Sequence, residues 1–566
     1  MCLINLKSFW LAITKDKFLL LILLLGLILK TTNPTFGSPS LYISNDEAIA
    51  HLSAWNMLAQ KTPVSIANYT PLGAYVQIPF LVISFLAMKF LGLVTNAHDF
   101  ELFVLTHEGY FLFIPRIISG FFGTMIILVV YKICRLLFEE KQAALIGAFL
   151  TAVSFNLVHI SHFGKPWAVA LFFFVLATYL ALKQKSMLSY LTVGLSYGFH
   201  QVGILAIPLA LLISKRLFAI KNLLGVMIMA ISIGIFSFLT LKVGIIKAIE
   251  QGQSFLKPGT IISDFLTGNQ NYLESLLGTI ANNFSAYFIV NFLVSDGVIL
   301  FFAIWGIFKT FNQGRNKKVL VLYLLFYFLF ASLFFHPLLR YLLPLILILI
   351  PFAAYGIYDV FLRFRLKYQK YIGWILTIII LTLASINSLW WNWLYIKTPT
   401  FIQAHNWINK NIPTDVPIAY IGGRYQTFTP NKVAIKHMQT INSNLYLRLS
   451  MNLPDGNLDN VRNIIYVSKF TGNNILEQFK NATVNYPVQY VVDYYLDPTE
   501  RLYNFEPSVF KLRAHFNPIR SNKSEGLPEP LFDATWNFPT NDLRPKVSMY
   551  SMERTGPYID ILEIKN

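Results

Sequence analysis

The sequence predicts an α-helical polytopic membrane protein with a separate α+β domain at its carboxy terminus. Three observations support this prediction. Of the 566 residues, 55% are hydrophobic and only 13% are charged, which is too apolar for an ordinary soluble protein. Apolar runs recur as far as residue 396, and many approach the length of about 20 residues that a bilayer-spanning helix needs. After Lys397 the runs shorten, and Asn, Pro and Asp become frequent.

The apolar runs predict about 11 transmembrane helices, together with juxtamembrane helices, within residues 1–396. The first run follows Lys15 and Lys17 and has no clear cleavage site after it, so we expect a retained anchor. The runs lie near residues 18–30, 72–94, 113–134, 142–160, 167–182, 187–213, 222–241, 287–310, 319–335, 341–361 and 371–396.

Basic clusters between the runs predict the orientation, because Lys and Arg are in excess in cytoplasmic loops. All the clusters can lie inside the cell under two conditions. Residues 72–94 lie along the outer interface without crossing, and residues 187–213, interrupted by GFHQVG, form a hairpin of two short helices. The protein is then integral to the plasma membrane with its amino terminus in the cytoplasm, whereas the first outer loop, 31–112, is extracytoplasmic. The formal net charge of +18 is divided among these clusters, which argues against a nucleic-acid surface.

Residues 397–566 predict an extracytoplasmic α+β domain of about 170 residues, an ordinary domain size. The stretch FIQAHNWINKNI has helical spacing and ends before Pro413. The following VPIAYIGG predicts a short strand that closes on a turn.

The acidic pair Asp46–Glu47 follows the first apolar run, in SNDEAIAHLSAWNMLAQ. A carboxylate in a pocket near the membrane surface can act as general base on an acceptor hydroxyl. The pair also has a structural interpretation, because Ser44 and Glu47 have the spacing of a capping box at the start of a helix. From the residues alone both interpretations stay open.

The order of several segments resembles the C superfamily of glycosyltransferases. They are the acidic pair, then YTPLGAYVQIPFL, then the long stretch from IPRIISGFFG to HISHFGKP, and later HPLLRYLLPLILILIPFAAYGI and WINKNIP. The resemblance covers most of residues 40–400. It is closest to the branch that contains protein O-mannosyltransferases (dolichyl-phosphate-mannose-protein mannosyltransferases) and the aminoarabinose transferase of lipid A.

This resemblance implies an integral-membrane glycosyltransferase of the cell envelope, a hexosyl or pentosyl transferase that takes its sugar from a polyprenyl phosphate. The first acid of the pair, Asp46, is expected to deprotonate an acceptor hydroxyl on a protein, lipid or polysaccharide, with inversion at the anomeric carbon. Glu47 is expected to tune its charge or position the acceptor.

The leaving phosphate needs positive charge, and three cations lie on the predicted outer side: Arg116, Lys165 and Arg340. Arg116 also matches an arginine of the family. Each of the three has an alternative role as an anchor at the lipid headgroups.

Four histidines, His51, His162, His200 and His336, are further candidates for polar site residues, although an isolated histidine is more often a packed side chain. Many relatives carry an acid where this chain has Trp167. We therefore predict no metal ion and no bound cofactor, with the lipid-linked sugar as co-substrate.

The main alternative function is that of a polytopic transporter or lipid flippase without glycosyl transfer. Secondary transporters commonly contain internal repeats, and this sequence shows none. An outer domain of this size also suits a surface enzyme better. The sequence does not indicate which sugar or which acceptor is used.

Overall fold

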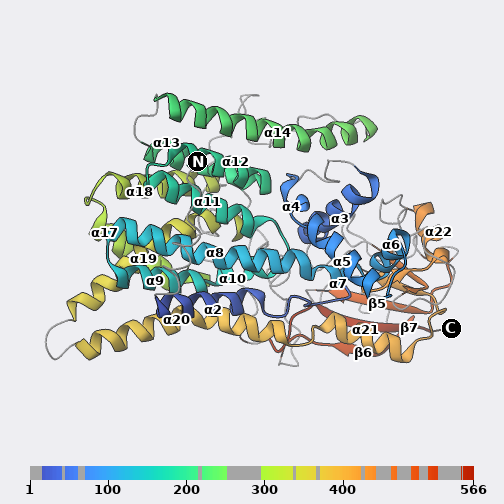
Figure 1. The fold of residues 1–566 in the computed structure, drawn as a ribbon. Helices are drawn as coiled ribbons and strands as arrows, with labels where there is room; N and C mark the ends of the chain where they lie inside the picture. The colour runs from blue at the N-terminus through green and yellow to red at the C-terminus, as the bar shows by residue number, and fades with distance from the viewer. Residues whose placement is uncertain are drawn as a thin grey trace, which may run out of the picture.

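The computed structural model describes residues 16–40, 45–61, 70–214, 219–251, 293, 295–334, 339–364, 370–421, 427–441, 461–467, 483, 486–495, 508–519, 550 and 552–565. A bundle of helices occupies one side of the molecule and a β-sheet the other (Figure 1). The helices α3 to α7 lie at the same end of the molecule as the sheet, above it in this view.

The helical part follows the predicted apolar runs closely. Its elements are α2 (Lys17–Thr31), α3 (Asn45–Gln60), α4 (Leu72–Tyr75), α5 (Ile78–Phe90), α6 (Ala97–Thr106), α7 (Glu108–Phe111), α8 (Phe113–Phe138), α9 (Lys141–Val153), α10 (Phe155–His162), α11 (Trp167–Leu182), α12 (Ser186–Phe199), the 3₁₀ helix η1 (Gln201–Ala206), α13 (Ile207–Ile213), α14 (Ile220–Gln251), α17 (Ser295–Thr310), α18 (Arg315–Phe334), the 3₁₀ helix η3 (Leu339–Leu342), α19 (Leu343–Arg363) and α20 (Lys370–Ile396).

Within the described residues, the predicted runs 142–160 and 187–213 are broken helices. The run 142–160 divides into α9 and α10, which meet at an angle of 47°. The run 187–213 divides into α12, η1 and α13. Because the side chain of Gln184, before α12, donates a hydrogen bond of 3.4 Å to the carbonyl of Ile213, at the end of α13, the two ends of this run lie together. The predicted hairpin is therefore confirmed.

Within the described residues, five helices are long and apolar enough to cross a membrane, and six if the bent pair α9–α10 counts as one span. The protein is thus an integral membrane protein, but the predicted count of eleven spans is not confirmed. Residues 72–90 are among the five, so their placement along the outer interface stays a prediction. The five are Leu72–Phe90, Gly109–Phe138, Ile220–Thr240, Leu343–Arg363 and Tyr371–Asn411.

Glycines allow a close contact between the helices α17 and α19. A Cβ atom at Gly306 would lie 1.9 Å from the carbonyl oxygen of Phe352, and one at Gly356 would lie 2.2 Å from that of Phe302. Such an approach of two backbones is open only to glycine and is typical of helices packed in a membrane.

The carboxy-terminal region contains a five-stranded mixed sheet in the order β4-β1-β5-β7-β6. Strand β1 is parallel to β4 and β5, and β7 is antiparallel to β5 and β6. The predicted helix and first strand are confirmed as α21 and β1. The elements are α21 (Thr400–Asn411), β1 (Ile418–Ile421), β2 (Thr429–Pro430), α22 (Lys432–Ile441), β3 (Val461–Arg462), β4 (Ile464–Val467), β5 (Tyr490–Tyr495), β6 (Phe510–Phe516) and β7 (Tyr558–Ile564).

Candidate active site at the start of helix α3

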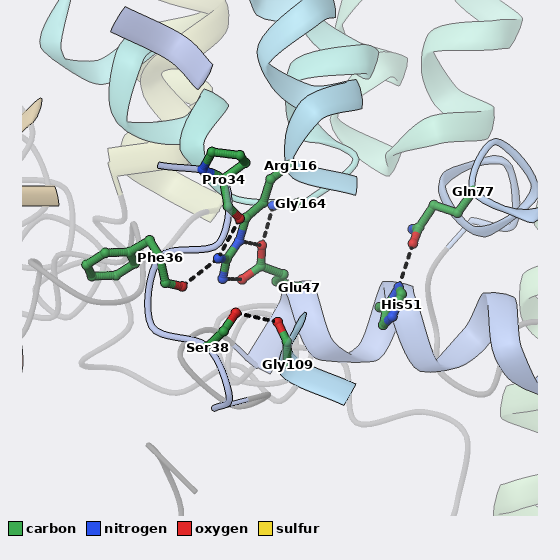
Figure 2. Close-up of polar contacts among 9 residues, drawn as sticks. All are labelled: Pro34, Phe36, Ser38, Glu47, His51, Gln77, Gly109, Arg116 and Gly164. Carbon is green, nitrogen blue, oxygen red and sulfur yellow. Dashed lines mark hydrogen bonds and ion pairs between the residues drawn. The ribbon is translucent and has the colours of Figure 1, made fainter. Parts of the chain in front are cut away.

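Glu47, in the first turn of α3, forms a buried ion pair with Arg116, in the first turn of α8 (Figure 2). The guanidinium Nε lies 2.7 Å from Oε1, and Nη2 lies 2.9 Å from Oε2. Glu47 is fully buried and Arg116 is 2% exposed. A two-point contact of this kind is a strong and direction-specific charge-assisted interaction. It joins two segments that are 69 residues apart in the chain.

Gly164 supplies a third donor to the same carboxylate. Its backbone N–H donates to Oε1 of Glu47 over 2.6 Å. A Cβ atom at this position would lie 2.6 Å from Cβ of Pro115 and 3.0 Å from Oε1 of Glu47. The turn between α10 and α11 therefore needs a glycine here to come close enough to α3.

The other side of the Arg116 guanidinium holds the segment that follows α2. Its Nη1 donates to the carbonyl oxygens of Pro34, at 3.1 Å, and of Phe36, at 2.6 Å. The Ser38 hydroxyl then donates to the carbonyl of Gly109 over 2.9 Å (Figure 2). Four of the five guanidinium N–H groups are thus engaged within the protein. This favours a role in holding the chain together, and phosphate binding by Arg116 stays a prediction.

Asp46, the predicted base, lies in α3 directly before Glu47, but its side chain is outside the described part of the structure. Ser44, on which the capping-box interpretation depends, is outside it as well. The backbone turn that carries Asp46 is held through the next residue, Glu47, which is bonded to α8 and to the turn between α10 and α11. The catalytic assignment itself stays a prediction.

Lys165 follows Gly164 and is buried, with 1% of its surface exposed. Its ammonium nitrogen lies 5.6 Å from the centre of the Phe163 ring. Lys165 also lines a small hollow, whose wall continues through Gly164 next to the ion pair. The other residues that line the hollow are Gly73, Val76, Gln77, Pro115, Ile118, Pro166 and Val169. A buried cation therefore lies beside the candidate site.

His51 lies one turn further along α3 and links this helix to the start of α5. Its Nε2 lies 3.0 Å from Nε1 of Trp55, and its Nδ1 lies 3.0 Å from Oε1 of Gln77. Because the indole N–H can only donate, Nε2 must accept, and Nδ1 then carries the proton given to Gln77. Burial lowers the pKa of His51 to about 4. The imidazole is thus a neutral, hydrogen-bonded group at pH 7.

Of the four remaining predicted site residues, the structure describes the side chains of His162 and His200. His162 is buried, and its ring stacks on Tyr395 with the centres 4.3 Å apart. His200 accepts the N–H of Val202 at the start of η1, and its ring centre lies 4.0 Å from that of Trp167. His336 and the side chain of Arg340 lie outside the described residues.

Among the described residues, no three His, Cys, Asp or Glu side chains are arranged to hold a metal ion. The absence of a metal requirement stays a prediction.

Sequence reasoning missed Gly164 and Gln77. A glycine two residues before a proline is typical of an ordinary turn, and only the approach of α3 shows what Gly164 does. Gln77 had no signal at all, since a single amide in an apolar stretch can serve many partners. Both residues become visible only through contacts with α3.

No protein-family model matches the chain, and no curated protein matches it. Solved structures that are similar to it include the Archaeoglobus fulgidus oligosaccharyltransferase in complex with Zn and sulfate, with a TM-score of 0.46 and 12% identity over 84% of this chain and 68% of that one. ArnT from Cupriavidus metallidurans is similar in two states. The apo structure has a TM-score of 0.40 and 10% identity over 90% of this chain and 96% of that one. The structure bound to undecaprenyl phosphate has a TM-score of 0.44 and 9% identity over 89% and 96%.

Proposed function

We propose that this protein is an integral-membrane glycosyltransferase that moves a sugar from a polyprenyl phosphate to an acceptor hydroxyl on the extracytoplasmic side. The observation that supports it best is the buried contact of Glu47 with Arg116 and Gly164. This contact holds the helical turn that carries Asp46 beside a hollow lined by the buried cation of Lys165.

The proposed reaction is a single displacement with inversion. Asp46 takes the proton of the acceptor hydroxyl, and the acceptor oxygen forms a bond to the anomeric carbon. The bond from that carbon to the phosphate oxygen breaks on the opposite face, and polyprenyl phosphate leaves with the electron pair. Lys165 and Arg340 supply positive charge for the developing phosphate dianion.

The two acids of the pair have different tasks in this mechanism. Both carboxylate oxygens of Glu47 accept hydrogen bonds within the protein, and Oε1 accepts two of them. A carboxylate so engaged is poorly placed to take a substrate proton. We therefore assign the base to Asp46 and the positioning of the α3 turn to Glu47.

The test is transfer from a tritium-labelled undecaprenyl-phosphate sugar to cell-envelope acceptors by the purified Asp46→Asn variant. Loss of the base is expected to lower kcat by about 10² to 10⁴, the usual contribution of general base catalysis. The matched control is Asp99→Asn, which removes a partly exposed carboxylate in the first turn of α6, in the same predicted outer loop. Undiminished transfer by a folded Asp46→Asn protein would rule out the assignment.

A further inference from the structure

The break between α9 and α10 is filled by two buried charges from other helices. Ser154 separates the last residue of α9 from the first of α10. A break inside a membrane helix leaves carbonyls at one new end and N–H groups at the other, and lipid offers no partner for either.

Lys30, the penultimate residue of α2, covers the carboxyl end of α9. Its Nζ donates to the carbonyl oxygens of Thr151, at 3.2 Å, and of Ala152, at 3.3 Å. The hydroxyl of Ser388 donates to the next carbonyl, that of Val153, over 2.6 Å. Lys30 is fully buried. A cation at this position also matches the negative end of the helix dipole.

Asp296, at the start of α17, covers the amino end of α10. Its Oδ1 accepts the backbone N–H of Phe155 at 3.0 Å, and its Oδ2 accepts that of Asn156 at 3.3 Å. The side chains of Ser154, at 2.9 Å, and Asn156, at 2.7 Å, donate to Oδ2 as well. The carboxylate is 4% exposed. It takes the position that an anionic ligand would take at a free helix amino terminus.

The occupied break argues against the transporter alternative at this location. In transporters with discontinuous helices, the open half-helix ends hold the substrate and the coupling ion. In this chain both ends are filled by side chains of the protein itself. A structural role for the α9–α10 break therefore fits better than a role in transport.

Helix α2, which carries Lys30, and helix α10, whose amino end Asp296 caps, both lead directly to the candidate site. Six residues after Lys30, the carbonyl of Phe36 accepts a hydrogen bond from Arg116. Two residues after the end of α10, Gly164 donates to Glu47. Gly123 allows α2 and α10 to pack closely against α8, since a Cβ atom there would lie 2.2 Å from Oγ of Ser161 and 3.2 Å from Cδ of Lys30.

We propose that Lys30 and Asp296 are positioning residues. By capping the two helix ends at the α9–α10 break, they hold in place the two segments that lead to the Glu47–Arg116 pair. They act through Gly164 and the Pro34–Phe36 segment rather than on the substrate. Their effect on transfer rests on the proposed function, whereas their effect on the conformation of these segments does not.

The experiment compares the full-length variants Lys30→Met and Asp296→Asn with the wild type in two measurements. Hydrogen–deuterium exchange is followed in peptides covering residues 31–36 and 155–164. Kinetics are followed with the tritium-labelled undecaprenyl-phosphate sugar and normalised to folded protein. The matched control is Asp359→Asn, which removes a carboxylate that also bonds to α17, through Nε1 of Trp305 at 3.0 Å.

In both variants we expect faster exchange in the two peptides and a kcat lower by about tenfold to a hundredfold, because small misplacements of a site have effects of this size. The KM for the donor should change by less than about twofold, since neither residue is expected to touch it. The double variant should be less impaired than the product of the single effects, because both residues act on the same break and their effects are therefore coupled. The control should leave both peptides and kcat unchanged.

Wild-type exchange in both peptides of the folded variants would overturn the inference, whether or not transfer is observed. Faster exchange with unchanged kcat would also overturn it, because the held segments would then not serve the site. If the wild type transfers no sugar, the proposed function fails, and the exchange data still decide whether the two charges hold these segments.

Discussion

The buried Glu47–Arg116 pair makes the conservative change Glu47→Gln a severe one. Three N–H donors converge on the two carboxylate oxygens, two of them on Oε1. A glutamine that keeps its oxygen toward these two donors turns its NH₂ toward Nη2 of Arg116, where two donors then face each other. The guanidinium, 2% exposed, also loses its counter-charge.

Removing one partner of a buried ion pair costs about 3–5 kcal/mol, most of it from the charge left unpaired. We therefore expect Glu47→Gln to lower the free energy of unfolding by about 3–5 kcal/mol. The measurement is denaturant or thermal unfolding of the purified protein, followed by tryptophan fluorescence. The control is Glu101→Gln, since Glu101 pairs with exposed His98 and surface changes of this kind stay within about 0.5 kcal/mol.

A double variant separates the effect of the buried charges on stability from the effect of side-chain packing. Glu47→Leu combined with Arg116→Met removes both charges, and the double variant should be more stable than either single variant. Wild-type stability of Glu47→Gln would refute the reasoning, because the pair could then not be buried as the structure has it. Additive losses in the double variant would refute the claim that the unpaired charge dominates.

Three further predictions concern the same region. Gly164→Ala should lower stability by about 1–3 kcal/mol and reduce transfer, since its Cβ would lie 2.6 Å from Pro115; unfolding and kinetic assays check both, and a neutral variant would contradict the tight turn. Because the folded pKa of His51 is about 4, below the ordinary 6.5, its contribution to stability is full above pH 6.5 and is lost as the pH falls toward 4; His51→Gln should flatten the pH profile of unfolding in this window, and an unchanged profile would contradict it. A reporter fused near residue 100 should report the outside, whereas a cytoplasmic signal would mean that residues 72–90 cross.

The pattern of apolar runs was readable from the sequence because each run must satisfy its own backbone within lipid. The run 167–182 coincides with α11, and the run 341–361 covers the end of η3 and most of α19. The GFHQVG interruption predicted a hairpin, and the structure contains it. The number of spans was less readable, because short and bent helices such as α9 and α10 do not differ in composition from spanning ones.

Two buried charged residues could have been singled out from the sequence, although their contacts could not. Lys30 and Asp296 lie within or beside apolar runs, and an ionisable residue at such a place is a signal in itself. Their partners were not predictable, because Lys30 contacts carbonyls 121 and 122 residues away. Backbone carbonyls carry no sequence signature.

The sequence by itself determined that this chain is a membrane protein with a carboxy-terminal α+β region and that Asp46–Glu47 is a candidate for chemistry. Hydrophobic length and local periodicity decide such features, and both are properties of short stretches of chain. Only the tertiary structure decided what Glu47 does, since its task depends on Arg116 and Gly164, which lie 69 and 117 residues away. The energy of a buried ion pair comes from geometry and desolvation, and these exist only once distant segments have packed together.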